Sequence, residues 1–256
     1  MKLSYLLSVL DKVCPLKLSY DCIAQGGYDN SGLLVKTHDK VNKILFSLDF
    51  SDKCLETALS IGADTVITHH PAIYNPIKTL DTTGENCLIA KAVQNGLNII
   101  SMHLNLDIAN GGIDESLAYG LGGKNLTTLN IGFIGYGKEF TVKKTTLNDY
   151  AKTIEKTFNT KKLLVYGDGE ETVENVASFC GAGGSEGMSY DGKADLIVTS
   201  DISHHEIKAI IEKGKKLIIL PHYTAESYGF TKFYNKITEI IGSEVQTEIF
   251  VDQRYI

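Results

Sequence analysis

Two short apolar runs that each end at histidine constrain this chain more than any other feature. The run Asp64 to Thr68 is β-branched and apolar, which predicts a buried strand that stops at His69 and His70. The run Leu97 to Met102 predicts a second strand, which opens onto His103 to Asp107. Ligands bind beyond the carboxyl ends of the strands in open α/β sheets, so we expect a ligand site at this edge.

A shorter form of the same arrangement recurs near the C-terminus. Lys193 to Thr199 predicts a strand, a helical stretch follows, and Lys216 to Leu220 predicts a second strand. In both halves the second strand is followed by a histidine with a carboxylate four residues later. These pairs are His103 with Asp107 and His222 with Glu226. The pattern indicates an internal duplication with ligand-type residues at matching positions.

Strands that alternate with helices predict an α/β fold with a largely parallel sheet that carries helices on its faces. The predicted helices include Glu85 to Asn95 and Ala225 to Ile241. Between about residues 126 and 190 the composition shifts to β-forming residues studded with glycine. We therefore predict a second, smaller α/β lobe over 126–190 and a metal-binding α/β lobe or lobes over 1–125 plus 191–256.

Charge and cysteine content narrow the class of protein. The formal net charge of -6 argues against a general binder of nucleic-acid backbones. No apolar stretch reaches the ~18 residues that a membrane-spanning helix needs. The five cysteines are scattered and lack CxxC spacing, which indicates reduced thiols rather than a disulfide framework or a thiolate zinc site. We expect a cytoplasmic protein without a membrane partner.

The histidines and carboxylates at the predicted strand ends combine into a candidate metal site. Its members are His69, His70, Asp107, His222 and Glu226. Imidazole and carboxylate ligands without thiolate suit Zn, Mn, Fe, Ni or Co. Five such ligands can hold two divalent metal ions about 3.5 to 4 Å apart. Adjacent residues of a regular strand point to opposite faces, but Pro71 favours a turn that lets both histidines serve one site.

Plainer interpretations exist for these features. An isolated pair of histidines is often a hydrogen-bonded structural pair, and histidine and glutamate four apart on a helix are often a surface pair. The glycine-rich stretch Cys180 to Ser185 can present backbone N–H groups to an anion, although a tight turn is the simpler interpretation. The loop from Ala72 to Thr83 is either a flap over the strand ends or a plain connection.

Two further histidines are candidate catalytic groups. His103 is an acid–base or substrate-facing candidate, and His205 could face the same cavity together with Asp201. A structural histidine is the alternative for each of them. His38 lies in a polar loop and is predicted to be exposed.

Five motifs follow one another along nearly the whole chain: Tyr28 to Val35, Ile67 to Pro71, His103 to Asp107, Ser200 to His205, and His222 to Glu226. Together they resemble the Nif-three-like dinuclear-metal-centre family, whose members are often labelled GTP cyclohydrolase 1 type 2 homologues. The chain departs from the family pattern at three positions. Tyr28 stands where Trp is common, Pro221 where Gly is usual, and Ala225 where Ser or Thr is found.

The resemblance implies two interlocked α/β lobes and a toroidal homohexamer whose metal sites face an internal cavity. It also implies a ligand set, in which one carboxylate bridges the two ions. Carried over by motif, the ligands are His69, His70, Asp107, His222 and Glu226, with Glu226 as the bridge. None of the three departures removes a ligand, but Pro221 and Ala225 each lie beside one.

These observations lead to a metal-dependent hydrolase, of cyclohydrolase or phosphoesterase type, as the leading hypothesis. In it a hydroxide formed at the metal centre attacks a ring carbon or a phosphoester, and His103 or His205 moves protons. The expected substrate is a nucleotide or another phosphoester. The alternative is a hexameric metal-binding scaffold or regulatory protein without catalytic turnover. Nucleic-acid handling inside the ring gains little from the acidic composition.

Overall fold

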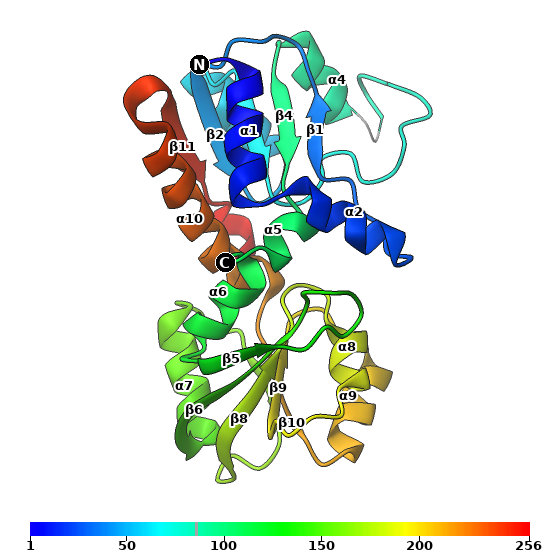
Figure 1. The fold of residues 1–256 in the computed structure, drawn as a ribbon, viewed down its shortest axis with the longest axis vertical. Coiled ribbons are helices and arrows are strands. Elements are labelled where there is room, and N and C mark those ends of the chain that lie inside the picture. Colours follow the sequence, from blue (N-terminus) through cyan, green and yellow to red (C-terminus); the bar gives the residue numbers. More distant parts are fainter. Residues whose placement is uncertain (85–86) are drawn as a thin grey trace. The chain divides into compact units, whose positions relative to one another are not determined.

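The computed structural model describes residues 1–84 and 87–256, which form two compact α/β units (Figure 1). The first unit contains Met1–Ala109 and Phe230–Arg254, and the second contains Asn110–Gly229 with Tyr255 and Ile256. In the described part of the chain, no helix is both long and apolar enough to cross a membrane. The two α/β units confirm the predicted α/β fold class, with sheets covered by helices.

A five-stranded sheet forms the centre of the first unit. Its strands are β1 (Gly32–Val35), β2 (Lys43–Ser47), β3 (Thr65–Thr68), β4 (Asn98–Ser101) and β11 (Gln246–Phe250). Their spatial order is β1-β4-β3-β2-β11, and every neighbouring pair is parallel except β1 with β4. The three central strands, β2, β3 and β4, are short and largely buried because both faces of this sheet are covered.

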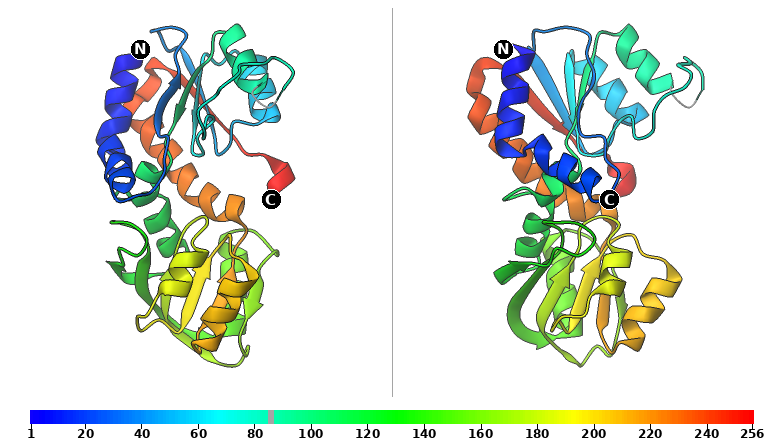
Figure 2. Two further views of the ribbon diagram at one scale, coloured as in Figure 1. Left: turned by 90° about the vertical axis from the view of Figure 1, so that its right-hand side faces the viewer. Right: turned by 45° about the vertical axis from the view of Figure 1, so that its right-hand side comes forward.

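Helices cover both faces of this sheet. One face carries α1 (Leu3–Val13) and the later part of α10 (His222–Ile241), and the other carries α3 (Asp52–Ile61) and α4 (Cys87–Gln94) (Figure 2). Alternate strand residues point to opposite faces, so Leu45, Val66 and Ile99 pack with residues of α3 and α4. Glu85, the predicted start of α4, lies outside the described residues.

The remaining elements of the first unit were not all expected. The predicted helices omitted α2 (Leu16–Ala24) and the five-residue α5 (Leu104–Ile108). Two short 3₁₀ helices flank β11, η1 (Gly242–Glu244) and η2 (Gln253–Tyr255). Short helices are hard to predict because their stability comes from tertiary packing rather than from local propensity.

The second unit is built on a six-stranded mixed sheet. Its strands are β5 (Lys124–Thr128), β6 (Lys138–Thr146), β7 (Leu164–Tyr166), β8 (Thr172–Ser178), β9 (Leu196–Thr199) and β10 (Lys216–Ile219). The order is β5-β6-β8-β9-β10-β7, and only β8, β9 and β10 pair in parallel. On one side lie α6 (Ile113–Gly120) and α7 (Leu147–Thr157), and on the other α8 (Gly184–Ser189) and α9 (His204–Glu212) (Figure 1).

The boundaries of the two units differ from the predicted ones at 126 and 190. The reason is strand pairing: β9 and β10, which follow residue 190, extend the same sheet as β6 and β8. Hydrogen bonds between these strands hold residues 191–229 in the second unit together with 126–190. Composition along the chain carries no information about this pairing.

The internal duplication is visible as a repeated βαβ arrangement. In the first unit β3, α4 and β4 follow one another, and β3 and β4 are parallel neighbours. In the second unit β9, α9 and β10 do the same. His103 and His222 follow the second strand of each arrangement, as the sequence pattern predicts.

Phe46 lies at the centre of the core between the first sheet and α10. It is fully buried, and its ring centroid lies 6.4, 6.2 and 5.1 Å from the rings of Phe230, Phe233 and Tyr234. Phe46→Ala is expected to lower the free energy of unfolding by about 3–5 kcal/mol, through lost burial and the cavity left behind. Urea unfolding followed by circular dichroism measures this change. The matched control is Tyr5→Ala, at a half-exposed ring, which should stay within about 0.5 kcal/mol of the native protein.

Candidate metal centre

Three histidines gather at the carboxyl ends of β3 and β4. His69 and His70 directly follow β3, and His103 follows β4 as the residue before α5. Because β3 and β4 are parallel neighbours in register, their ends meet at one edge of the sheet. A ligand nitrogen from each of the three histidines lies within 4.8 Å of the others. The described residues thus bring His103 to the same cluster as His69 and His70.

A bend after β3 lets both adjacent histidines join this cluster. The Thr68 hydroxyl donates to the His70 carbonyl oxygen at 2.8 Å, and the His70 N–H donates to Leu48 at 2.9 Å. The two imidazole rings therefore lie with their centroids 4.8 Å apart instead of on opposite faces. The turn expected before Pro71 accounts for this geometry.

Asp107 reaches the cluster because the chain folds back through α5. The Asp107 N–H donates to the carbonyl oxygen of His103 at 2.9 Å, which closes one helical turn. The buried Asp107 carboxylate then lies with Oδ1 3.5 Å from Nε2 of His69. The short helix that sequence patterns missed is what places this predicted ligand.

The three histidines share one hydrogen-bonding pattern. Nδ1 of His69 donates to the Met102 carbonyl oxygen at 2.8 Å. Nδ1 of His70 donates to Asp49 and Nδ1 of His103 to Asp29, both at 2.7 Å. Carbonyl and carboxylate oxygens only accept, so the hydrogen resides on Nδ1 and Nε2 becomes the basic nitrogen. This arrangement is typical of histidines that bind metal through Nε2.

Asp29 and Asp49 were not singled out by sequence reasoning. Asp49 lies shortly after β2, and Asp29 lies shortly before β1. Their positions beside predicted strands were the sequence signal by which they could have been found. Burial raises the pKa of Asp29, but hydrogen bonds from His103, Ser19 and Ser31 outweigh it and lower the pKa to about 2. Asp29 is therefore a carboxylate at neutral pH and holds His103 in one orientation.

The second unit positions His222 and Glu226 on the first turn of α10. The helix begins at His222, three residues before the predicted start at Ala225, which brings residues four apart onto one face. Nε2 of His222 lies 2.9 Å from Oε2 of the buried Glu226. Nδ1 of His222 donates to Asp201 at 2.8 Å, the same pattern as in the first unit. Asp201 thus contacts His222.

The glycine-rich stretch after β8 shapes the surroundings of Glu226. The carbonyl oxygen of Gly181 accepts hydrogen bonds from the N–H groups of Ser200 and Asp201 at 3.3 and 3.1 Å, which tie this stretch to the segment that follows β9. A Cβ at Gly181 would lie 2.8 Å from Oε1 of Glu226, and its φ is +61°. Glycine is therefore required here both by the left-handed backbone and by the carboxylate packed against it.

The other candidate histidines lie elsewhere in their units. His205 is exposed on the first turn of α9, where Nδ1 is 2.8 Å from the Ser203 hydroxyl that caps this helix. Its catalytic role stays a prediction. His38, predicted to be exposed, is half-buried, with Nε2 3.2 Å from the Asn98 amide and 3.9 Å from Asp64. It is held there because the loop folds against the start of β4.

The fold and the histidine–carboxylate pairs define a two-unit α/β protein with candidate metal-binding groups. The chain belongs to the Duf34/NIF3 (NGG1p interacting factor 3) family, whose model matches residues 1–254. The family resemblance proposed from the five motifs is thereby confirmed.

One curated relative matches nearly the whole chain, and another matches about half of it. The chain is 29% identical over 258 residues to the GTP cyclohydrolase 1 type 2 homolog of Clostridium perfringens, a match that covers 96% of this chain and 95% of that protein. The protein of the same name from Staphylococcus aureus strain MRSA252 is 33% identical over 131 residues, 51% of this chain and 34% of that protein.

Solved structures show the same fold. Staphylococcus aureus hypothetical protein SA1388 superposes with a TM-score of 0.84 at 26% identity, covering 98% of this chain and 97% of that one. Reduced HcgD from Methanocaldococcus jannaschii gives a TM-score of 0.82 at 25% identity, with 97% of both chains covered. These likenesses support the α/β fold class predicted from the alternation of strands and helices.

The donor set of each unit fits a divalent cation. Imidazole Nε2 atoms and carboxylate oxygens approach one another to 3.5 Å in the first unit and to 2.9 Å in the second. Oxygen partners on Nδ1 keep the imidazoles in the metal-binding tautomer. The residues predicted as metal ligands therefore fit that role within each unit.

Low pH should reduce the stability of the first unit through protonation of Asp29. Its pKa is lowered from 3.8 to about 2, so the unfolded chain takes up a proton first as the pH falls. The stability that Asp29 contributes is complete above about pH 4 and is lost as the pH falls toward 2. Urea unfolding at pH 7, 4 and 3 should show a shallower acid decline for Asp29→Asn. Asp191→Asn, at an exposed carboxylate, should follow the native protein; a decline of Asp29→Asn as steep as the native one would contradict this role.

Gly181→Ala should displace the Glu226 carboxylate. Gly214 is the matched control, because its φ is +74° but nothing lies within 4 Å of a Cβ there. Both substitutions should lower the free energy of unfolding by roughly 1–2 kcal/mol through left-handed backbone strain. Only Gly181→Ala should also weaken Zn²⁺ or Mn²⁺ binding in titration calorimetry, by about tenfold or more, as other losses of ligand support do. Equal affinities in the two variants would exclude this role of Gly181.

Proposed function

We propose that this protein is a metal-dependent hydrolase that binds two divalent metal ions. The ligands are His69, His70, Asp107, His222 and Glu226, with Glu226 as the bridge. The observation that carries the proposal is the shared pattern of the ligand histidines. His69, His70 and His222 each donate from Nδ1 to an oxygen at 2.7–2.8 Å, so that Nε2 is the ligand nitrogen in every case.

When bound, two such ions lower the pKa of water and polarise a substrate oxygen. The ligands fit Zn, Mn, Fe, Ni or Co, because no thiolate accompanies the imidazoles and carboxylates. The chain's own contribution is to hold the ligands in place: Asp49 and Asp201 orient His70 and His222, and Gly181 leaves room for the Glu226 carboxylate.

His103 is the favoured acid–base group of the proposed reaction. Asp29 accepts its Nδ1–H, which directs the basic Nε2 toward the cluster formed by His69 and His70. An imidazole fixed in this way can accept a proton at Nε2 and return it, while the low pKa of Asp29 keeps the supporting carboxylate charged. His205 is the second candidate for proton transfer, as proposed from its motif.

A nucleotide or another phosphoester is the proposed substrate. The name of the Clostridium perfringens relative, GTP cyclohydrolase 1 type 2 homolog, agrees with attack on a ring carbon of a nucleotide. We further propose a toroidal homohexamer in the cytoplasm as the working form. A hexameric metal-binding scaffold or regulatory protein without turnover is the competing function.

Metal analysis combined with a substrate screen tests the proposal. Purified protein reconstituted with Zn²⁺, Mn²⁺, Fe²⁺, Ni²⁺ or Co²⁺ should retain two ions per chain and open GTP or cleave a phosphoester from the panel. Glu226→Ala should lose metal and reduce turnover by at least about a thousandfold, because the proposed bridge is gone. Glu239→Ala removes an exposed carboxylate of the same helix and should behave as the native protein.

The competing functions give different results in the same experiment. Two ions per chain without turnover of any substrate, and with assembly or partner binding that responds to metal, would support the scaffold. Failure of the protein to retain two ions under any of the five metals would overturn both functions. Light scattering of the native protein and of Glu226→Ala reports whether the assembly persists.

A further inference from the structure

Two exposed tyrosines lie beside the histidine cluster of the first unit. Tyr28 and Tyr74 are each 47% exposed although they contact each other. Their rings meet edge to face with centroids 4.9 Å apart. The Tyr74 ring in turn lies 6.5 Å from the ring of His103, at an interplanar angle of 82°. A wall of aromatic surface therefore extends from the candidate acid–base histidine to solvent.

Hydrogen bonds hold this wall in place. The Tyr28 hydroxyl donates to the carbonyl oxygen of Tyr74, and the Asn30 side-chain amide donates to the carbonyl oxygen of Ile73 at 2.6 Å. Both bonds tie the loop after His70 to the segment before β1, far away in sequence. Rigid aromatic surface lowers the entropy lost on binding, so a fixed and exposed pair suits recognition of a flat ligand.

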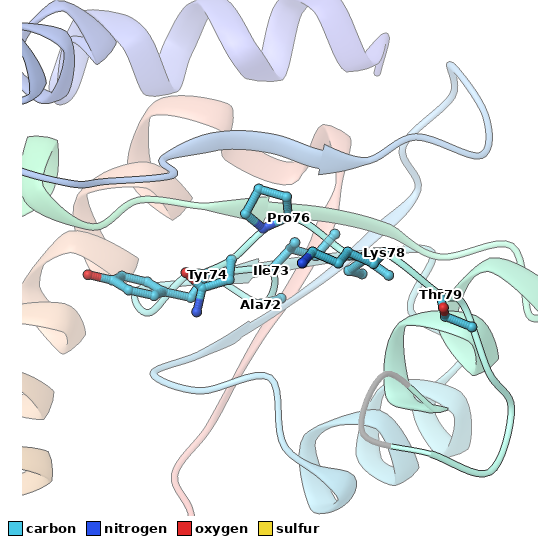
Figure 3. A pocket seen from close by; sticks show the side chains of 8 residues that line it. Ala72, Ile73, Tyr74, Pro76, Lys78 and Thr79 are labelled. Carbon is cyan, nitrogen blue, oxygen red and sulfur yellow. The ribbon is translucent and has the colours of Figure 1, made fainter.

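The same loop encloses a pocket. It is lined by residues 72–79, has a volume of about 470 Å³, and includes the Tyr74 side chain (Figure 3). Volumes of this order accommodate small organic ligands. In Figure 3 Tyr74 and Thr79 lie at opposite ends of the row of lining residues, and Lys78 lies between them. Lys78 is the one charged side chain among these eight residues, so the pocket favours a ligand with an anionic group.

We propose that the Tyr28–Tyr74 wall binds the planar base of a nucleotide by stacking, with Lys78 attracting its phosphate. This inference rests on the proposed function and assigns the residues that bind the base and the phosphate of its nucleotide substrate. Stacking on tyrosine accepts every base because each has a flat π-face, so the wall selects nucleotides as a class.

Binding of adenosine monophosphate to the metal-free protein tests the inference without any need for turnover. Calorimetric titration should show binding of adenosine and guanosine monophosphates with affinities within about tenfold of each other, as stacking predicts. Ribose 5-phosphate, which lacks the base, should bind at least about fivefold more weakly than the nucleotides. Adenosine, which lacks the phosphate, should also bind at least about fivefold more weakly, because it loses the attraction to Lys78.

Variants of the wall provide the matched comparisons. Tyr74→Ala should weaken binding of adenosine monophosphate by roughly 5- to 150-fold, whereas Tyr74→Phe keeps the ring and should bind as the native protein does. Tyr119→Ala, at a 54% exposed tyrosine in the second unit, is the control for loss of an exposed ring. Lys78→Gln should remove the advantage of adenosine monophosphate over adenosine.

The outcomes separate this inference from the proposed function. Equal binding of adenosine monophosphate by Tyr74→Ala and the native protein, or no binding by the native protein, would overturn the stacking site even if two metals are retained. Loss of binding on Tyr74→Ala in a protein that holds no metal would support the stacking site while the hydrolase proposal fails.

Discussion

Parallel pairing of β3 with β4 is the constraint on which the candidate site depends. The register of this pair aligns Thr68 with Ser101, so the residues that follow the two strands emerge side by side. Buried on both faces, these strands cannot slip by one residue without moving their apolar side chains into the wrong layer. The positions of His69 and His103 are therefore determined by the packing of the core rather than by the loops that follow.

Oxygen acceptors next to the histidines fix the orientation of each imidazole ring. Asp29, Asp49 and Asp201 each accept a hydrogen bond from an imidazole Nδ1, and the Met102 carbonyl does the same for His69. An imidazole without such a partner can rotate and exchange tautomers, which lowers its value as a ligand or a base. The same hydrogen bond, from an imidazole Nδ1 to an oxygen, recurs in both units. It thus connects the duplicated topology to the chemistry of the site.

The loop after His70 shows how one segment can serve two purposes. Its backbone is held to the segment before β1 by Tyr28 and Asn30, and its exposed tyrosine lies beside His103. The sequence alone allows either a flap or a plain connection for this loop. The hydrogen bonds to Tyr28 and Asn30 anchor it, and the pocket along residues 72–79 gives it a surface for recognition.

The sequence by itself determined the strands that carry the site, the repeated βαβ pattern, the residue types that suit a divalent cation and the family to which the chain belongs. Apolar runs of strand length and the spacing of His222 from Glu226 are local properties, so they can be predicted from one chain. Only the tertiary structure decided the partners of each histidine, the role of Gly181 and the boundaries of the two units. Those features depend on contacts such as Asp29 with His103 and Glu226 with Gly181, which join residues far apart in sequence and arise from packing.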